Sequence, residues 1–295
     1  MAQALDLKGA GGDRAARLAG AAPAPKAARD ENFPVGSRLL RRDLRPHVAR
    51  FYAFARAADD VADDPALAPP EKVRRLDAFE AALDGRPGPP EGAALRASLA
   101  ETGVSDRHAR DLLAAFRHDA TESRCADWAA LARYCAHSAH PVGRFMLDLH
   151  GEGAATHAPS DALTAALQVL NHLQDLGEDR RRLDRIYLPL DWMAEEGAAA
   201  EDLDARAASP ALRRVIDRAL DGCDAWLERA APLPRLVASP RLAGECAAIL
   251  ALARRLAARL RRDDPLARRV ALSRADVARA AATGGATALL RLVRR

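Results

Sequence analysis

The sequence predicts an all-α fold, in which about ten helices form one domain. From Glu31 onward, apolar residues recur at intervals of three and four, as they do on one face of a helix. No run of β-branched residues alternates with polar residues in the way that a half-buried strand requires. Clusters of proline, glycine and serine divide the chain into segments of helical length, and no internal repeat is present. With 295 residues, 49% of them hydrophobic, the chain is long enough to bury a sizeable core.

We place the all-α domain at residues 30–290 and expect residues 1–29 to be disordered. This first segment is rich in small residues and has few large apolar side chains to bury. Gly9, Gly11 and Gly12 do not form a dinucleotide-binding loop, because Arg14 stands where the third glycine belongs and no strand precedes them.

Turn and cap signals set the expected helix boundaries in order along the chain. We expect a helix from about Arg45 to Asp63, and Pro70 with Glu71 mark the start of the next one. The segment "DGRPGPPEG" is a loop, and further on the segment "GVSD" offers Ser105 or Asp106 as a helix N-cap. Later breaks are expected at "HAPSDA", "YLPLD", "AASPAL", "PLPRL" and "VASPRL".

Charge and cysteine content limit the partners and the compartment. The net charge is only +4, and basic and acidic residues alternate along most of the chain, so we expect no nucleic-acid partner. The segment "ALLRLVRR" is basic without compensating acids and is a candidate for contact with lipid head groups. The four cysteines form no C-x-x-C pair, there is no secretory signal, and the longest apolar run, "CAAILALA", is too short to span a membrane. The sequence therefore predicts a cytoplasmic protein, soluble or at most peripheral on the inner face of the membrane.

A first group of acidic residues lies in "FYAFARAADDVADDP", residues 51–65. At helical spacing, one face carries Tyr52, Arg56, Asp59 and Asp63, and the other faces carry apolar side chains suited to a core, namely Val48, Phe51, Phe54 and Ala58. Carboxylates on successive turns repel each other, but they suit a magnesium ion that is otherwise held by water and substrate phosphate. The alternative interpretation is a solvated acidic helix end before a proline loop.

A second polar stripe lies in residues 163–189, "LTAALQVLNHLQDLGEDRRRLDRIYLP". Gln168, Asn171, Asp175 and Asp179 follow each other at steps of three, four and four on a helix that is otherwise apolar over most of its circumference. Buried acids and amides are costly unless they are paired or bound to a metal. Two such stripes on facing helices form a set of oxygen ligands, with arginines nearby to meet phosphate oxygens.

Four segments together carry a resemblance to a known family. "ENFPVGSRLL", "VARFYAFARAADDVADD", "YCAHSAHPVG" and "LQVLNHLQDLGEDRRRLDRIYLP" resemble the squalene and phytoene synthase family of head-to-head prenyl synthases, from about Glu31 to Leu190. The resemblance implies an all-α isoprenoid synthase bundle around a central cavity that binds Mg²⁺ and diphosphate. It implies metal ligands at Asp59, Asp63, Asn171, Asp175 and Asp179, catalytic roles for the first four of these and for Tyr52, and substrate or diphosphate contacts at Arg56, Gln168, Arg185, Tyr187, Phe33 and Asn32.

Within the family, the chain looks most like the hydroxysqualene synthase branch of bacterial hopanoid pathways. Asn32 and the His140–Pro141 pair depart from the phytoene synthase pattern and fit this branch. The resemblance implies that presqualene diphosphate ionises, rearranges and captures one water to give hydroxysqualene. Large residues are candidates for the lining of the apolar cavity, although each also suits a plain core: Phe33, Val35, Leu39, Phe51, Val142, Phe145 and Met146.

Histidines and cysteines receive no ligand role. His137 and His140 share a helix face without a third metal ligand, so capping or packing is expected for both. His172 is expected to point away from the polar stripe. Cys135 is expected to be a small buried residue.

Three other functions remain open at this stage. The chain fits a presqualene diphosphate or phytoene synthase that couples two prenyl diphosphates itself. It also fits a class I terpene cyclase, although "RIYLP" favours the head-to-head family, and a non-catalytic helical assembly protein, against which the intact acidic stripes argue. The sequence does not determine the substrate chain length, the number of metal ions or the oligomeric state.

Overall fold

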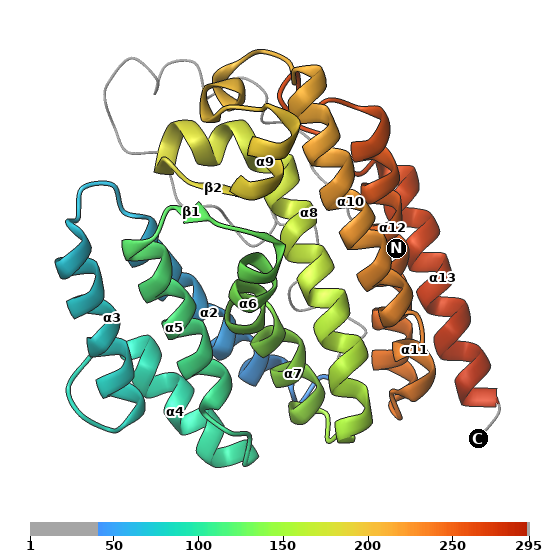
Figure 1. Cartoon of the computed structure of the whole chain (residues 1–295). Helices are drawn as coiled ribbons and strands as arrows, with labels where there is room; N and C mark the ends of the chain where they lie inside the picture. Colours follow the sequence, from blue (N-terminus) through green and yellow to red (C-terminus); the bar gives the residue numbers. More distant parts are fainter. Residues whose placement is uncertain (1–40, 294–295) are drawn as a thin grey trace, which may run out of the picture. The chain divides into compact units, whose positions relative to one another are not determined.

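The helical prediction is confirmed over residues 41–293, which the structure, a computed structural model, describes (Figure 1). Residues 1–29, for which disorder is expected, lie outside this range. The same is true of four candidate positions: Asn32, Phe33, Val35 and Leu39. The α-helices are α2 Arg45–Asp63, α3 Pro69–Leu83, α4 Pro90–Thr102, α5 Arg107–Thr121, α6 Trp128–Ser138, α7 His140–Leu149, α8 His157–Leu183, α9 Leu190–Glu196, α10 Pro210–Ala230, α11 Leu233–Leu236, α12 Pro240–Arg262 and α13 Arg274–Val293. Two short 3₁₀ turns, Ala154–Thr156 and Ala200–Asp204, and strands β1 Arg124–Cys125 and β2 Ile186–Pro189 complete the described elements.

Helix α2 has the predicted boundaries because a proline lies near each end. Pro46 occupies the first turn, where its missing N–H costs nothing, and Pro65 follows a C-cap residue in extended conformation. The predicted core face of this helix is buried, including Phe51 and Phe54. Helices α3, α4 and α5 pack beside it, so this half of the fold holds the first acidic stripe in place.

Helix α8 is the centre of the fold and packs against α6, α7, α10 and α12 (Figure 1). The predicted break at "HAPSDA" is wrong, because α8 begins at His157 and runs through this segment for 27 residues. Pro159 lies in the first helical turn, where proline is tolerated, so the segment starts a helix instead of interrupting one. The predicted burial of the helix is confirmed, with Leu163, Val169 and Leu170 among its buried residues.

Two short strands are a difference from the purely helical expectation. Strand β2 falls on the predicted break "YLPLD", pairs in parallel with β1 and carries Tyr187. A strand of two residues cannot display an alternating pattern, so the sequence contained no period-two signal for this pair. The pairing holds the segment after α8 beside the chain that follows α5, where the Ile186 N–H donates to the carbonyl oxygen of Ser123 at 2.9 Å.

Serine caps start helices α10 and α12, and two glycines allow α12 and α13 to pack closely. Ser209 and Ser239 accept hydrogen bonds from the backbone N–H of Leu212 and Leu242 and so cap α10 and α12, at two of the predicted breaks. Helices α12 and α13 approach closely at Gly244 and Gly284, where an added Cβ on either residue lies 2.6 Å from the other's carbonyl oxygen. Glycine is therefore required at both positions for this helix pair to pack.

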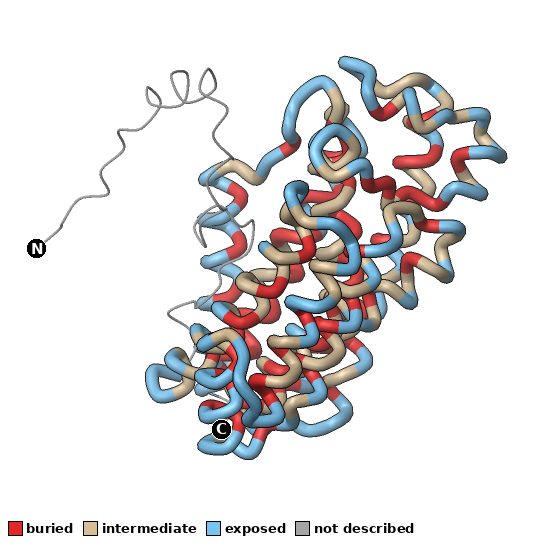
Figure 2. The backbone as a smooth tube through the Cα atoms, turned by 90° about the vertical axis from the view of Figure 1, so that its left-hand side faces the viewer, coloured by how far each residue is buried: buried red, intermediate tan, exposed pale blue. Residues whose placement is uncertain are grey.

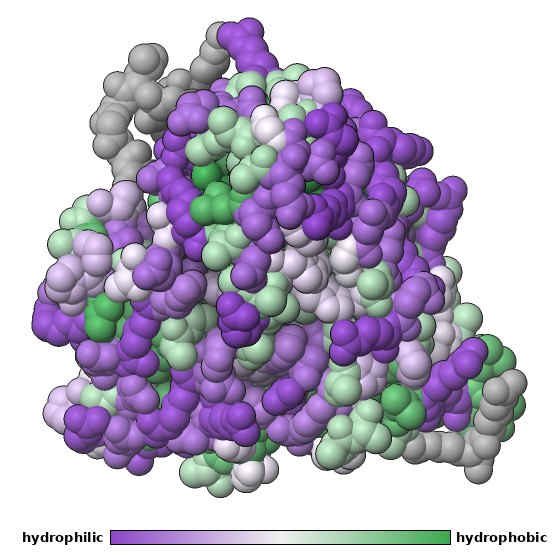
Figure 3. All heavy atoms as spheres, viewed as in Figure 1, coloured by the Kyte–Doolittle hydropathy of each residue, from purple (hydrophilic) through white to green (hydrophobic). Residues whose placement is uncertain are grey.

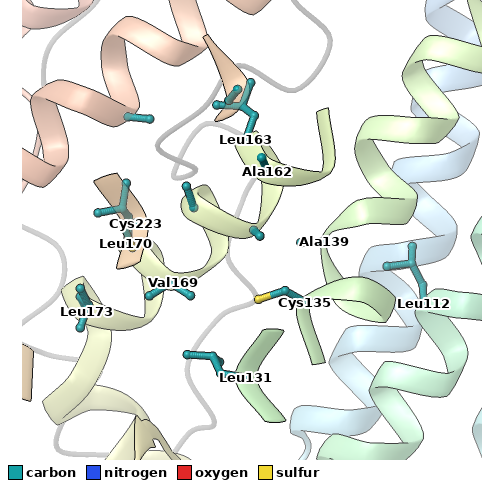
Figure 4. Packing of buried hydrophobic residues seen from close by; sticks show 14 of the residues in the cluster. Leu112, Leu131, Cys135, Ala139, Ala162, Leu163, Val169, Leu170, Leu173 and Cys223 are labelled. Atoms are coloured by element: carbon teal, nitrogen blue, oxygen red, sulfur yellow. The ribbon is translucent and has the colours of Figure 1, made fainter. Parts of the chain in front are cut away.

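The buried residues form one continuous cluster that involves almost all the helices (Figure 2). All four cysteines are free and buried, and in Figure 4 the Cys135 side chain of α6 points toward the helix that carries Val169. The expectation that Cys135 is a small buried residue is confirmed. Within residues 41–293, no helix combines the length and hydrophobicity needed to cross a bilayer.

Candidate active site

The first acidic stripe lies on the last two turns of α2, where one arginine partly neutralises it. Arg56 Nη1 lies 3.3 Å from Asp59 Oδ2, and Arg56 Nη2 donates to Asp60 Oδ1 at 2.6 Å. Burial, followed by repulsion from Asp63, raises the pKa of Asp59 to about 7. The Asp59 side chain is still 37% exposed, so it lies in a recess that water reaches from one side. The end of α2 therefore holds more negative charge than its own arginine compensates.

Arg185, one residue before β2, joins α2 to α5. Its side chain is 7% exposed, and its Nη1 donates to Asp63 Oδ1 at 2.6 Å. Its Nη2 donates to the carbonyl oxygens of Asp119 at 3.0 Å and Ala62 at 3.3 Å. The predicted site residues Arg185 and Asp63 are thus brought together, although 122 positions separate them in the sequence.

Asp119 of α5 and Tyr134 of α6 also belong to this site, and the sequence analysis missed both. The Tyr134 hydroxyl donates to Asp119 Oδ2 at 2.8 Å. Burial raises the pKa of Asp119, and Arg185 and Tyr134 oppose that rise. Burial, with the Asp119 charge beside it, also raises the pKa of Tyr134 well above its usual value, so the phenol keeps its proton at neutral pH. Tyr134 is the first residue of the segment "YCAHSAHPVG", so the sequence did contain a signal for it. Asp119 lies in none of the four segments that carry the resemblance and in neither polar stripe.

The second stripe meets the same network through His172 and Tyr187. These two rings are stacked with their centroids 3.5 Å apart, and the centroid of the Tyr134 ring lies 5.5 Å from that of the Tyr187 ring. His172 Nε2 lies 3.1 Å from Gln168 Nε2, and His172 Nδ1 lies 3.9 Å from Asp179 Oδ2. The expectation that His172 points away from the stripe is wrong, because stacking on Tyr187 turns its ring between two members of that stripe.

The remaining predicted residues lie on the expected helices. Tyr52 and Asn171 are half-buried on α2 and α8. Asp175 pairs with Arg269, from the segment between α12 and α13, at 3.3 Å. Among residues 41–293, no three histidine, cysteine, aspartate or glutamate side chains are grouped closely enough to hold a metal ion by themselves. Metal ligation by Asp59, Asp63, Asn171, Asp175 and Asp179 therefore stays a prediction.

A cavity of about 380 Å³ borders this network between α5, α6, β1 and β2. Asp119, Tyr134, Arg185 and Tyr187 line it, together with the basic side chains of Arg124 and Arg133. The wall of the cavity therefore contains Asp119 and Tyr134, which the sequence did not predict as site residues. It also contains Arg185 and Tyr187, which the sequence did predict.

Four residues of the predicted apolar lining lie within residues 41–293, and none of them is part of the wall of this cavity: Phe51, Val142, Phe145 and Met146. Phe51 and Phe145 stack on each other with ring centroids 3.9 Å apart and belong to the hydrophobic core. Val142 is 42% exposed. For Phe51 and Phe145, the structure fits the alternative interpretation of plain core residues.

Comparison with known proteins identifies the family. A model of the squalene/phytoene synthase family matches residues 26–276. The chain belongs to this family. A hydroxysqualene synthase from Rhodopseudomonas palustris is 46% identical over 248 residues, covering 84% of this chain and 85% of the relative. A second one, from Zymomonas mobilis, is 41% identical over 254 residues, covering 85% and 86%.

Solved structures agree with the family and the fold. The squalene synthase HpnC from Alicyclobacillus acidocaldarius is 33% identical with a TM-score of 0.69, covering 77% of this chain and 87% of that one. The predicted isoprenoid synthase fold is therefore confirmed, and so is the resemblance to the hydroxysqualene synthase branch. Membership makes this chain an enzyme of the isoprenoid synthase type with head-to-head prenyl synthase activity, and it argues against the terpene cyclase alternative.

Proposed function

We propose that this enzyme converts presqualene diphosphate to hydroxysqualene, with Mg²⁺ as cofactor, as a step of hopanoid biosynthesis. The observation that carries the proposal is the network of Asp63, Arg185, Asp119 and Tyr134, which joins the acidic end of α2 to α5 and α6. The Tyr134 ring in turn lies beside the His172 ring of α8, with centroids 6.1 Å apart. The high identity to hydroxysqualene synthases over most of both chains supports the choice of reaction within the family.

The residues of the two stripes suit a magnesium ion held by few protein oxygens. Mg²⁺ prefers carboxylates, keeps several waters and shares substrate phosphates, so it does not need three protein ligands in one cluster. The pKa of Asp59 is raised first by burial and then by repulsion from the neighbouring carboxylate of Asp63, and a divalent cation relieves both effects. We propose that Asp59 and Asp63 on α2, and Asn171, Asp175 and Asp179 on α8, are the protein ligands available for Mg²⁺ binding, so that each ion takes only a few of them. When bound, Mg²⁺ neutralises the negative charge that develops on the departing diphosphate.

Arginines of this site are suited to bind the diphosphate oxygens. Arg56 Nε is buried and has no hydrogen-bond acceptor among the described residues, so it is a donor available to an anion. Arg185 is held by Asp63 and two carbonyl oxygens. Because its side chain is already fixed beside the cavity, it does not have to move when the diphosphate binds. Tyr187, which lies near Arg185, and Gln168, which contacts His172, are proposed as further polar contacts for the substrate.

The reaction proceeds by loss of diphosphate and capture of water. The C–O bond to the diphosphate breaks, the resulting cyclopropylcarbinyl cation rearranges, and a water oxygen forms the new C–O bond and loses a proton. Because Tyr134 keeps its proton, it donates a hydrogen bond instead of acting as a base, and it holds Asp119 in a fixed position. The His172 ring stacks on the Tyr187 ring beside this network, and we expect the pair to limit the access of bulk water.

A second candidate function is the coupling of two prenyl diphosphates to presqualene diphosphate or phytoene. A phytoene synthase from Mycobacterium tuberculosis is 34% identical over 272 residues and covers 87% of both chains, which favours keeping this candidate. The two functions differ in substrate, because coupling requires two allylic diphosphates and water capture requires one presqualene diphosphate.

Product analysis separates the candidates. Purified enzyme is incubated with Mg²⁺ and either farnesyl diphosphate or presqualene diphosphate, with and without a nicotinamide donor. We expect hydroxysqualene from presqualene diphosphate with or without the donor, and no product from farnesyl diphosphate. Squalene formed only with the donor, or presqualene diphosphate formed from farnesyl diphosphate, contradicts the proposal. Unchanged pathway output in cells carrying Asp59→Ala and Asp175→Ala supports a non-catalytic assembly protein instead.

A further inference from the structure

An exposed apolar patch lies on the last turns of α13. Its members are Leu289, Leu290, Leu292 and Val293, which are 63%, 56%, 58% and 77% exposed. The opposite face of the helix packs on α12 through Ala280, Gly284 and Ala288, so these four side chains point away from the fold. Figure 3 shows hydrophobic atoms gathered beside this end of α13, at the lower right. Four adjacent large apolar side chains exposed to water indicate a contact surface.

The neighbouring helix α11 extends the patch. Arg291 Nη1 donates to the carbonyl oxygens of Pro234 and Arg235, at 2.9 and 2.7 Å, and so fixes the end of α13 against α11. Leu236, the last residue of α11, is itself 46% exposed. The apolar surface is therefore part of a fixed structure made by two helices.

The two chain segments that carry the patch are basic, and the nearby carboxylate of Glu152 accepts hydrogen bonds from the backbone N–H of Ala238 and Ser239. The sequence has no aspartate or glutamate from residue 229 to 244 or from residue 277 to 295. These segments contain Arg235 and Arg241, both exposed, as well as Arg291, and two arginines follow directly after Val293. Apolar side chains with a basic rim are the combination that binds an anionic lipid surface, where the arginines meet head groups and the leucines enter the acyl boundary.

We propose that the end of α13, with α11, docks the enzyme on the surface of an anionic bilayer. A second copy of the chain is a poorer occupant, because a two-fold contact through this patch places the arginine rims of both copies against each other. No described helix can span the membrane, so the docking is peripheral. This inference does not depend on the reaction assigned to the site.

Vesicle sedimentation with the full chain tests the proposal. We expect the enzyme to sediment with vesicles of phosphatidylcholine and phosphatidylglycerol, and to bind pure phosphatidylcholine vesicles about tenfold more weakly, because head-group charge supplies part of the affinity. High salt is expected to weaken binding to the anionic vesicles. The double variant Leu289→Glu with Leu292→Glu is expected to lose at least about tenfold in partition, since two apolar anchors are replaced by charges that the surface repels.

Val277→Glu is the matched control. Val277 lies on the same helix, is 50% exposed and stands twelve residues before the patch, so this variant is expected to bind vesicles like the parent. Circular dichroism checks folding, and Leu292→Ser with Val293→Ser serves as a milder second pair. Equal binding of the parent and both patch variants overturns the proposal. So does a parent that sediments in solution as a dimer and becomes monomeric in the patch variants, because the occupant is then a second copy.

Discussion

Replacement of Arg185 by methionine is expected to destabilise the fold more than any change to a surface arginine. The variant keeps a side chain of similar length but removes hydrogen bonds to Asp63 and to the carbonyl oxygens of Ala62 and Asp119. Removing one partner of a buried ion pair costs roughly 3–5 kcal/mol. The Asp63 side chain is 27% exposed, so water compensates part of the loss, and we expect about 3 kcal/mol. For a chain of 295 residues, this corresponds to a melting temperature about 5 °C lower.

Urea unfolding followed by far-UV circular dichroism at neutral pH measures this loss. Arg254→Met is the matched control, because Arg254 and its partner Glu228 are 46% and 75% exposed and the pair spans α12 and α10 at the surface. We expect this control to lose no more than about 1 kcal/mol. If Arg185→Met loses no more stability than Arg254→Met, the network at Arg185 does not hold β2 to α2 and α5, and the reasoning is refuted.

Three further predictions concern single residues. Because the folded-state pKa of Asp59 is raised from 3.8 to about 7, the folded state holds this proton more tightly than the unfolded state, and stability falls as pH rises through that interval. Asp59→Asn is therefore expected to flatten the pH dependence of stability and to raise the free energy of unfolding by about 1–2 kcal/mol above pH 7, a value reduced because the side chain is partly exposed. Product formation by this variant is expected to be lost. If unfolding of the variant shows the same pH dependence as that of the parent, the pKa assigned to Asp59 is contradicted. Tyr134→Phe removes the hydrogen bond to Asp119 and is expected to lower kcat about tenfold or more with a stability loss of about 1 kcal/mol; steady-state kinetics with kcat unchanged excludes a role in the reaction. Gly284→Ala is expected to cost about 1–3 kcal/mol because its Cβ meets a backbone oxygen of α12, whereas Gly285→Ala, which meets nothing within 4 Å, is expected to stabilise α13 slightly; thermal unfolding that ranks the two the other way contradicts the packing.

The helices that carry the site could be predicted because their signals are local. Helix α2 begins and ends as predicted, since prolines near both ends fix its boundaries within a few residues of sequence. The start of α8 was misjudged because proline in a first helical turn and proline in a break look alike in sequence. The strand at Tyr187 is too short for alternation to appear.

The contacts that build the site could be predicted only in part. The two stripes follow from spacing within single helices, which sequence displays directly. The pair Arg185 with Asp63 joins residues 122 positions apart, and Tyr134 reaches Asp119 across two helices, so neither contact has a periodic signal. The orientation of His172 depends on stacking with Tyr187, which β2 provides only after the strands have paired. Long-range contacts of this kind are set by tertiary packing.

The acidic stripes of α2 and α8 are proposed to act together on a metal-bound diphosphate. Calorimetric titration of the enzyme with inorganic diphosphate, with and without Mg²⁺, tests this proposal most directly. We predict binding that requires Mg²⁺ and is lost to a similar extent in Asp63→Asn on α2 and in Asp179→Asn on α8, with little further loss in the double variant. Diphosphate binding without Mg²⁺, or binding that survives either single substitution, contradicts the account.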